Sequence, residues 1–174
     1  MYGKTIGNGY ALTAVTGKKS IMKAAESTFI SSTFWTERIG SVAALKTLEV
    51  MEKYKSWEII THKGIEFRKK LIQISENNKL PIKISGIPAI TNYQFKSLNN
   101  FKYKTYITQE MLKKGFLAST CFYASVKHTS KQIDDYFFEL EKIFKTLSKC
   151  ENRNLKIENL LDSKVCHTGF KRLN

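Results

Sequence analysis

Hydrophobic residues recur with a helical period in three long stretches of the chain. Residues 37–54 carry an apolar side chain at every third position from Ile39 onward, which predicts a helix with one apolar face. A second helix is predicted from a Ser56 cap to Asn77-Asn78. A third begins where Thr129 and Gln132 fit a capping box and continues to about residue 149.

Shorter stretches change to the alternating period of β-strands. Residues 80–95 predict two short strands separated by Gly86-Ile87-Pro88, and residues 116–126 predict another. A helix is predicted between them over residues 103–114. Near the start, a glycine-dense loop precedes an apolar run over residues 10–15, which predicts a short buried strand.

The order of these elements predicts an α+β fold, bordering on α/β. Residues 80–149 are expected to form a small sheet that helices cover on one side. From Glu151 the sequence is polar and weakly periodic, so we expect a mobile tail.

Length and composition favour a folded chain. Its 174 residues, 42% of them hydrophobic, are enough for one domain, or for one domain and a fragment. No stretch approaches the ~18 apolar residues of a membrane span, and the first residues lack the apolar run of a secretory signal. We therefore expect a soluble protein in the cytoplasm.

The charge is strongly positive, with 29 Lys and Arg against 15 Asp and Glu, a net +14. This surplus raises nucleic-acid binding as a hypothesis, but the basic residues are spread over the whole chain, so no specific nucleic-acid partner is predicted. Cys121, Cys150 and Cys166 are odd in number and far apart, so they predict neither a disulfide framework nor a metal site.

The glycine-dense loop at the start contains the first candidate for chemistry, Lys4. The Gly3-Lys4-Thr5 triplet lacks the earlier glycine of a phosphate-binding P-loop, and Gly7-Asn8-Gly9 lacks the third glycine of a dinucleotide site. A lysine among glycines can lose solvation and become a nucleophilic amine. From spacing alone, an ordinary solvated loop lysine is the other reading.

Several segments, in order and with matching gaps over residues 3–148, resemble class III pyridoxal-phosphate aminotransferases, in particular the glutamate-1-semialdehyde aminomutase group. The resemblance rests on the following segments: Gly3–Tyr10 (GKTIGNGY), Ala14–Gly17 (AVTG), Ser31–Gly40 (SSTFWTERIG), Tyr103–Thr105, Gln109–Leu112, Lys114–Leu117 and His128-Thr129.

This resemblance implies the carboxyl-terminal part of a fold-type-I enzyme. Residues 1–78 would end the cofactor-binding large domain, residues 79–149 would form the small α+β domain, and residues 150–174 would be a polar tail. The implied cofactor is pyridoxal 5'-phosphate. The implied partners are a second copy in a homodimer, or a complementary amino-terminal half, and a small-molecule amino donor.

Residue by residue, Lys4 matches the lysine that binds the cofactor as an internal aldimine and then relays the proton. Thr33 matches the threonine that reaches the cofactor phosphate of the other subunit; without the match it is an ordinary loop or cap threonine. Arg38, where the sequence departs from the family pattern, is either a carboxylate ligand or a surface charge. We interpret His128 as a turn residue and Cys121 as a buried strand thiol.

The expected activity is amino-group transfer or intramolecular transamination on a small amino-carboxylate or amino-aldehyde. In the resembled family, the residues that stack on the cofactor ring and cradle its phosphate precede the lysine, so we expect the chain to be incomplete and inactive alone. The alternative is a non-catalytic interaction module that pairs with a complementary amino-terminal half.

Overall fold

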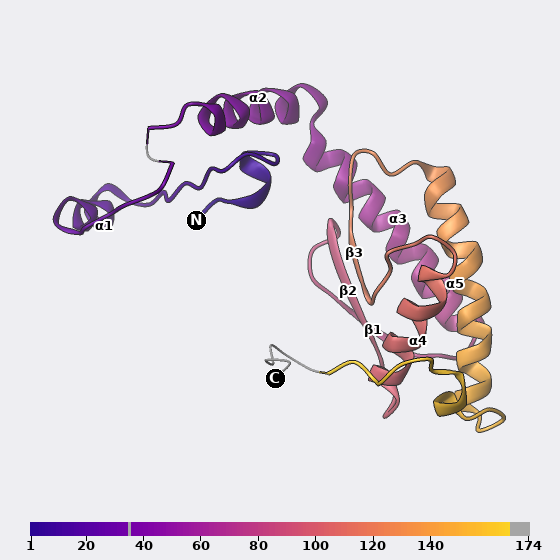
Figure 1. Ribbon diagram of the computed structural model, residues 1–174. Coiled ribbons are helices and arrows are strands. Elements are labelled where there is room, and N and C mark those ends of the chain that lie inside the picture. The colour runs from indigo at the N-terminus through magenta and orange to yellow at the C-terminus, as the bar shows by residue number, and fades with distance from the viewer. Residues whose placement is uncertain (35, 168–174) are drawn as a thin grey trace. The chain divides into compact units, whose positions relative to one another are not determined.

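The computed structural model describes residues 1–34 and 36–167, which fall into two compact units, Met1–Ser56 and Trp57–Asn174 (Figure 1). Trp35 of the predicted Ser31–Gly40 segment and the last seven residues of the predicted tail lie outside the described residues. The predicted domain limits at residues 78 and 149 stay predictions. Within the described part, no helix has the length and apolar character needed to cross a membrane.

The second unit is an antiparallel sheet with helices on one side. Its strands are β1 (Ile82–Ser85), β2 (Ile90–Phe95) and β3 (Cys121–Tyr123), hydrogen-bonded in that order. Ile82 pairs with Phe95, and Thr91 pairs with Phe122. Along β2, exposed and buried residues alternate, so only one face of the sheet enters the core. The predicted α+β fold is therefore confirmed, with β3 shorter than expected.

Three helices supply the other half of this unit. They are α3 (Ser56–Asn77), α4 (Asn100–Leu112) and α5 (Ser130–Glu151). The capping box predicted at Thr129 and Gln132 is present, with each side chain bonded to the other residue's backbone N–H. Figure 1 shows α3 and α5 side by side, and Lys70 of α3 pairs with Asp134 of α5 at 2.8 Å.

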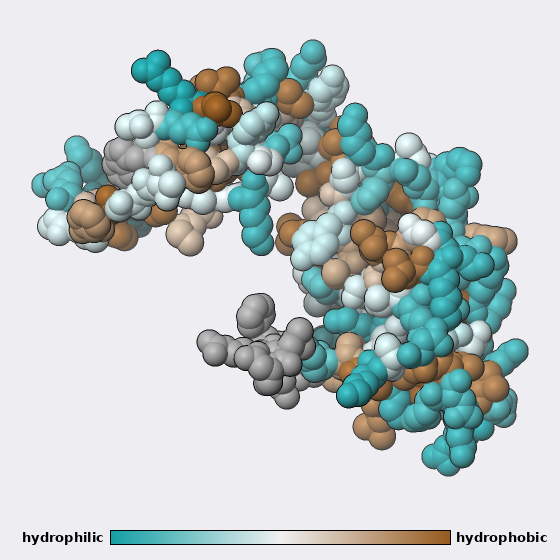
Figure 2. All heavy atoms as spheres, in the orientation of Figure 1, coloured by the Kyte–Doolittle hydropathy of each residue, from teal (hydrophilic) through white to brown (hydrophobic). Residues whose placement is uncertain are grey.

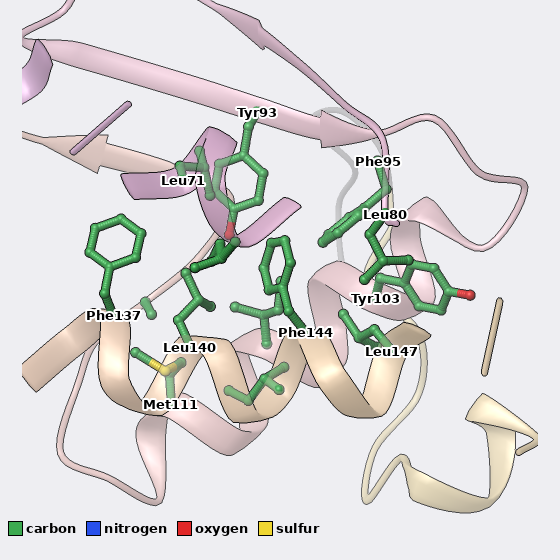
Figure 3. Close-up of a cluster of buried hydrophobic side chains, with 14 of the residues drawn as sticks. Leu71, Leu80, Tyr93, Phe95, Tyr103, Met111, Phe137, Leu140, Phe144 and Leu147 are labelled. Atoms are coloured by element: carbon green, nitrogen blue, oxygen red, sulfur yellow. The ribbon is translucent and has the colours of Figure 1, made fainter. Parts of the chain in front are cut away.

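The core of the second unit is continuous and rich in aromatic residues. Tyr93 and Phe95 point from β2 toward Leu140, Phe144 and Leu147 of α5 (Figure 3). Leu71, Tyr103 and Met111 from the other two helices are fully buried in the same cluster. Gly64 lets α3 approach the β1–β2 turn, because a Cβ there would lie 1.9 Å from the Pro88 carbonyl oxygen.

The predicted tail is held in place up to its last described residues, so the expectation of mobility is wrong there. Ile157, in a short 3₁₀ helix (Ile157–Leu160), is buried in the core. Gln109 of α4 donates to the Leu160 carbonyl at 2.9 Å and accepts from the Asp162 N–H at 2.7 Å. We call residues 152–167 the strap; the polar pattern hid the apolar residues Ile157 and Leu160, which pack on the core.

The first unit has little interior of its own. It contains 3₁₀ helix η1 (Lys4–Ile6), α1 (Lys19–Met22), 3₁₀ helix η2 (Lys23–Ser27) and α2 (Ile39–Tyr54). The strand predicted over residues 10–15 is wrong: an isolated bridge between Tyr2 and Ala14 is all that forms there in the described structure. No neighbouring strand among the described residues offers a ladder to that segment.

The predicted helix over residues 37–54 is confirmed as α2, but its apolar face is exposed. Ile39, Val42 and Leu45 are 54%, 64% and 70% exposed, and the residues that α2 buries are Gly40 and Ala44. Figure 2 shows brown, hydrophobic side chains at the surface where α2 lies.

Candidate functional site

Lys4 occupies a turn with an unusual backbone conformation. It has a φ of +52°, in the left-handed region that non-glycine residues rarely adopt, and it begins η1. The flanking bridge holds the turn, because Tyr2 and Ala14 exchange backbone hydrogen bonds of 2.7 and 2.8 Å. Strained, exposed residues of this kind cluster at functional sites. Within the described ranges, the Lys4 amine forms no hydrogen bond or ion pair, so it is available to a ligand.

Two glycines fix the backbone around this turn. A Cβ on Gly7 would lie 2.2 Å from the Tyr10 carbonyl oxygen, and a Cβ on Gly40 would lie 2.5 Å from the Ala11 carbonyl oxygen. Gly40 therefore allows the first turn of α2 to pack directly on the segment that follows Lys4, and η1 contacts α2. This role of Gly40 was not predicted from the sequence; the available signal is a glycine in the first turn of an apolar helix.

Thr33 lies in the turn before α2. This turn is exposed and rich in hydroxyl groups, and the Ser32 hydroxyl accepts from the Phe34 N–H at 3.4 Å. The first N–H groups of a 16-residue helix follow within a few residues, and such helix starts favour anions.

The structure places Lys4 and Thr33 in the same unit without a direct bond. No hydrogen bond joins the two residues within residues 1–34 and 36–167. The resemblance assigns Thr33 to the phosphate held by the other subunit, so contact within one chain is not required by that assignment. The roles of both residues stay predictions.

Arg38 lies beside a hollow in this unit. The hollow has a volume of about 380 Å³ and is lined by Tyr10, Arg38, Ile39, Val42 and Ala43. Arg38 forms no ion pair among the described residues. The hollow therefore presents one cation on an otherwise apolar surface that connects the Lys4 segment with α2.

The remaining candidates lie in the second unit. His128 follows the turn after β3, and its Nδ1 accepts from the Ser125 N–H at 3.2 Å. Its ring stacks on Phe122 with 5.2 Å between ring centroids. Burial and the nearby Lys63 lower the pKa of His128. Cys121 begins β3 and is half-buried rather than fully buried as expected.

The donor set of the first unit fits pyridoxal phosphate. This molecule has an aldehyde, which a primary amine can bind covalently, and a phosphate, which hydroxyl and backbone N–H groups bind. Lys4 offers the amine on a backbone that close glycine contacts hold in place, and the Ser31–Thr33 turn offers hydroxyl groups ahead of a helix.

Comparison with known proteins identifies the family. Residues 1–150 match the protein family described as "Aminotransferase class-III". The chain belongs to the class-III aminotransferase family.

The relatives of this class-III chain are named as aminotransferases and aminomutases. It is 30% identical over 154 residues to the 3-aminobutyryl-CoA aminotransferase of Cloacimonas acidaminovorans, covering 85% of this chain and 36% of the relative. It is 28% identical over 155 residues to the glutamate-1-semialdehyde 2,1-aminomutase of Clostridium botulinum, covering 78% and 36%. The class-III chain thus spans little more than a third of these relatives' length.

A solved structure supports the fold. The FumI protein of Sphingopyxis sp. MTA144, described as a PLP internal aldimine form, superposes with a TM-score of 0.77 at 21% identity, over 91% of this chain and 39% of FumI. The predicted fold-type-I class is confirmed. The predicted cofactor, pyridoxal 5'-phosphate, is also confirmed by the family and by this structure.

Proposed function

We propose that this class-III chain carries the cofactor-binding lysine and the small domain of a pyridoxal-phosphate-dependent aminotransferase or aminomutase. The observation that carries the proposal is the Lys4 turn, where an unpaired amine is presented on a left-handed backbone beside α2. Relatives are named for amino compounds that include 3-aminobutyryl-CoA, aminopentol and glutamate-1-semialdehyde. The substrate class we propose is a small amino-carboxylate or amino-aldehyde.

Each residue has a distinct part in this proposal. The cofactor, when bound, supplies an aldehyde and an electron-withdrawing ring. Lys4 would hold the aldehyde through its amine, and the same amine would carry the proton at the substrate carbon. Thr33 binds the phosphate held by a partner copy through its hydroxyl and backbone N–H. Arg38 orients the substrate carboxylate from the hollow beside Tyr10.

The experiment for Lys4 is chemical trapping. The chain is mixed with pyridoxal phosphate, reduced with borohydride and digested, and mass spectrometry locates the pyridoxyl group. We expect modification at Lys4, and loss of most of it in Lys4→Ala. Lys18→Ala, which removes another exposed lysine of the same unit, is the control. Labelling spread equally over the surface lysines would contradict the assignment.

We further propose that the chain does not turn over substrate alone. The described part offers Lys4 and the Ser31–Thr33 turn but no side chain that forms a hydrogen bond or ion pair with the Lys4 amine. Amino donors should give no turnover with the isolated chain, and turnover should appear when a complementary amino-terminal half of a class-III enzyme is added. Turnover by the isolated chain would overturn this point.

The exposed apolar residues of the first unit favour the second candidate function, a non-catalytic module that pairs with such a half. Phe29 is 93% exposed and Ile21 is 68% exposed, in addition to the α2 face. Surfaces of this kind mark interaction sites. Trapping at Lys4, combined with light scattering, distinguishes the candidates. A module without cofactor chemistry pairs with the complementary half but is not trapped at Lys4, whereas the enzyme does both. Light scattering of the chain alone detects a homodimer, which forms without the added half.

A further inference from the structure

A cavity in the second unit has no role in the proposed function. Its volume is about 680 Å³, within the usual range for small-molecule sites. It lies among α4, α5, β3 and the loop of residues 115–119, and its walls are mostly apolar. The largest apolar lining side chains are Leu112, Phe116, Leu117, Phe122 and Tyr123. Leu117 is 96% exposed and Leu112 is 56% exposed, so they form an open rim.

One tyrosine hydroxyl group at this cavity has no hydrogen-bond partner in the described residues. It belongs to Tyr136 of α5, which lines the cavity. Tyr93 is a core residue outside the lining; it is 1% exposed, and its buried hydroxyl is also unpaired. Burial raises the pKa of both tyrosines, so both hydroxyl groups stay protonated at neutral pH. A buried unpaired hydroxyl is costly, which favours a ligand or water that accepts its proton.

His128 adds a second donor. Because its Nδ1 accepts from the Ser125 N–H, the proton of the neutral ring lies on Nε2. His128 also lines the cavity. The lining of the cavity thus includes two donors, a tyrosine hydroxyl and an imidazole N–H.

The residues that line the cavity carry no negative charge, because no Asp or Glu belongs to them. Asp135, next to the lining residue Tyr136 in sequence, pairs with Lys131 at 2.7 Å. Lys63 donates to the carbonyl of the lining residue His128 and brings a positive charge to that side of the cavity. An acceptor with negative charge is therefore favoured over a neutral one.

We propose that this cavity binds a small molecule with an apolar body and one carboxylate. The apolar body lies against Phe116, Phe122 and the rim leucines, and the carboxylate accepts hydrogen bonds from Tyr136 and His128. This inference does not depend on the cofactor site.

The test is a titration of the full chain, labelled at its methyl groups, followed by NMR. The probe is 4-phenylbutyrate, and 4-phenylbutanol and 4-phenylbutylamine serve as the neutral and cationic analogues. We expect saturable shifts of the Leu112, Leu117 and Ala118 methyl groups with the carboxylate, and at least tenfold weaker binding of the analogues. Equal binding of the three probes, or no saturable shift up to millimolar concentrations, would overturn the proposal.

Two pairs of variants locate the site. Leu112→Trp fills the rim and should abolish the shifts, whereas Leu98→Trp, at a fully exposed position away from the cavity, should not. Tyr136→Phe keeps the ring and should weaken binding at least about tenfold, the effect of losing one hydrogen bond to a charged group. Tyr106→Phe, at a half-buried tyrosine outside the cavity, is its control. Unchanged binding in Leu112→Trp and Tyr136→Phe would place the probe elsewhere and refute the assignment.

Discussion

The two compact units bury their hydrophobic residues to very different extents. The second unit closes a core in which Leu71, Tyr103, Leu140 and Phe144 are inaccessible to solvent. In the first unit, Ala44 is the one hydrophobic residue described as buried. Because burial of apolar surface is the main stabilising term in folding, the second unit has the means to be stable on its own, whereas the first depends on further contacts. The unit that bears Lys4 is thus the one that needs a partner.

The largest difference in stability is expected when a leucine is replaced by alanine in each unit. Leu140→Ala empties part of the second core and should lower the free energy of unfolding by about 3–5 kcal/mol. Leu45→Ala, at a position that is 70% exposed, should change it by less than about 0.5 kcal/mol. Urea unfolding followed by circular dichroism measures both. Similar losses would show that the first unit has a core that the exposed fractions miss.

A second comparison uses the two close-approach glycines. In Gly64→Ala the new Cβ meets the Pro88 backbone, so we expect a loss of about 2 kcal/mol in unfolding free energy. Gly40→Ala should leave that free energy nearly unchanged, because the first unit adds little to the cooperative core. It should instead reduce trapping of pyridoxal phosphate at Lys4, since it displaces α2 from the Ala11 backbone. Normal trapping in Gly40→Ala would show that the position of α2 does not affect the reactivity of Lys4.

These contrasts show what the sequence could predict and what it could not. Local periodicity and the Thr129 capping box identified α2, α3 and α5 because those signals depend on neighbouring residues. The resemblance identified the family, although Lys4 and Thr33 stay unproved. The pairing of residues 10–15 and the burial of Ile157 depend on segments distant in sequence, so no local pattern contained them. The hollow at Arg38 requires the Gly40 contact, which is also a tertiary feature.

A smaller effect is expected where α4 holds the strap. Gln109→Ala removes hydrogen bonds to Leu160 and Asp162 and should lower the unfolding free energy by about 1–2 kcal/mol. Gln73→Ala, at an exposed position on α3, is the control. Amide hydrogen exchange should accelerate in the strap but not in β2. Unchanged exchange would contradict this role of Gln109 and leave the strap held by its apolar contacts and ion pairs.

The smallest effect concerns the ion pair of Glu158 with Lys102. This contact lowers the pKa of Glu158 below its ordinary 4.5, so the folded state binds its proton less tightly than the unfolded state. The stabilisation is present above pH 4.5 and is lost as the pH falls through the folded-state value. The Tm difference between the natural chain and Glu158→Gln should therefore be small at pH 7, shrink on acidification, and shrink in high salt. Glu76→Gln is the control, and a difference that grows in acid would contradict the sign.

Ile157 has a practical consequence for anyone who shortens this protein. The family match covers residues 1–150, yet the hydrophobic interior is completed seven positions later by Ile157. A chain trimmed at the end of that match would keep the sheet and the helices packed on it and still leave an unfilled space in its centre.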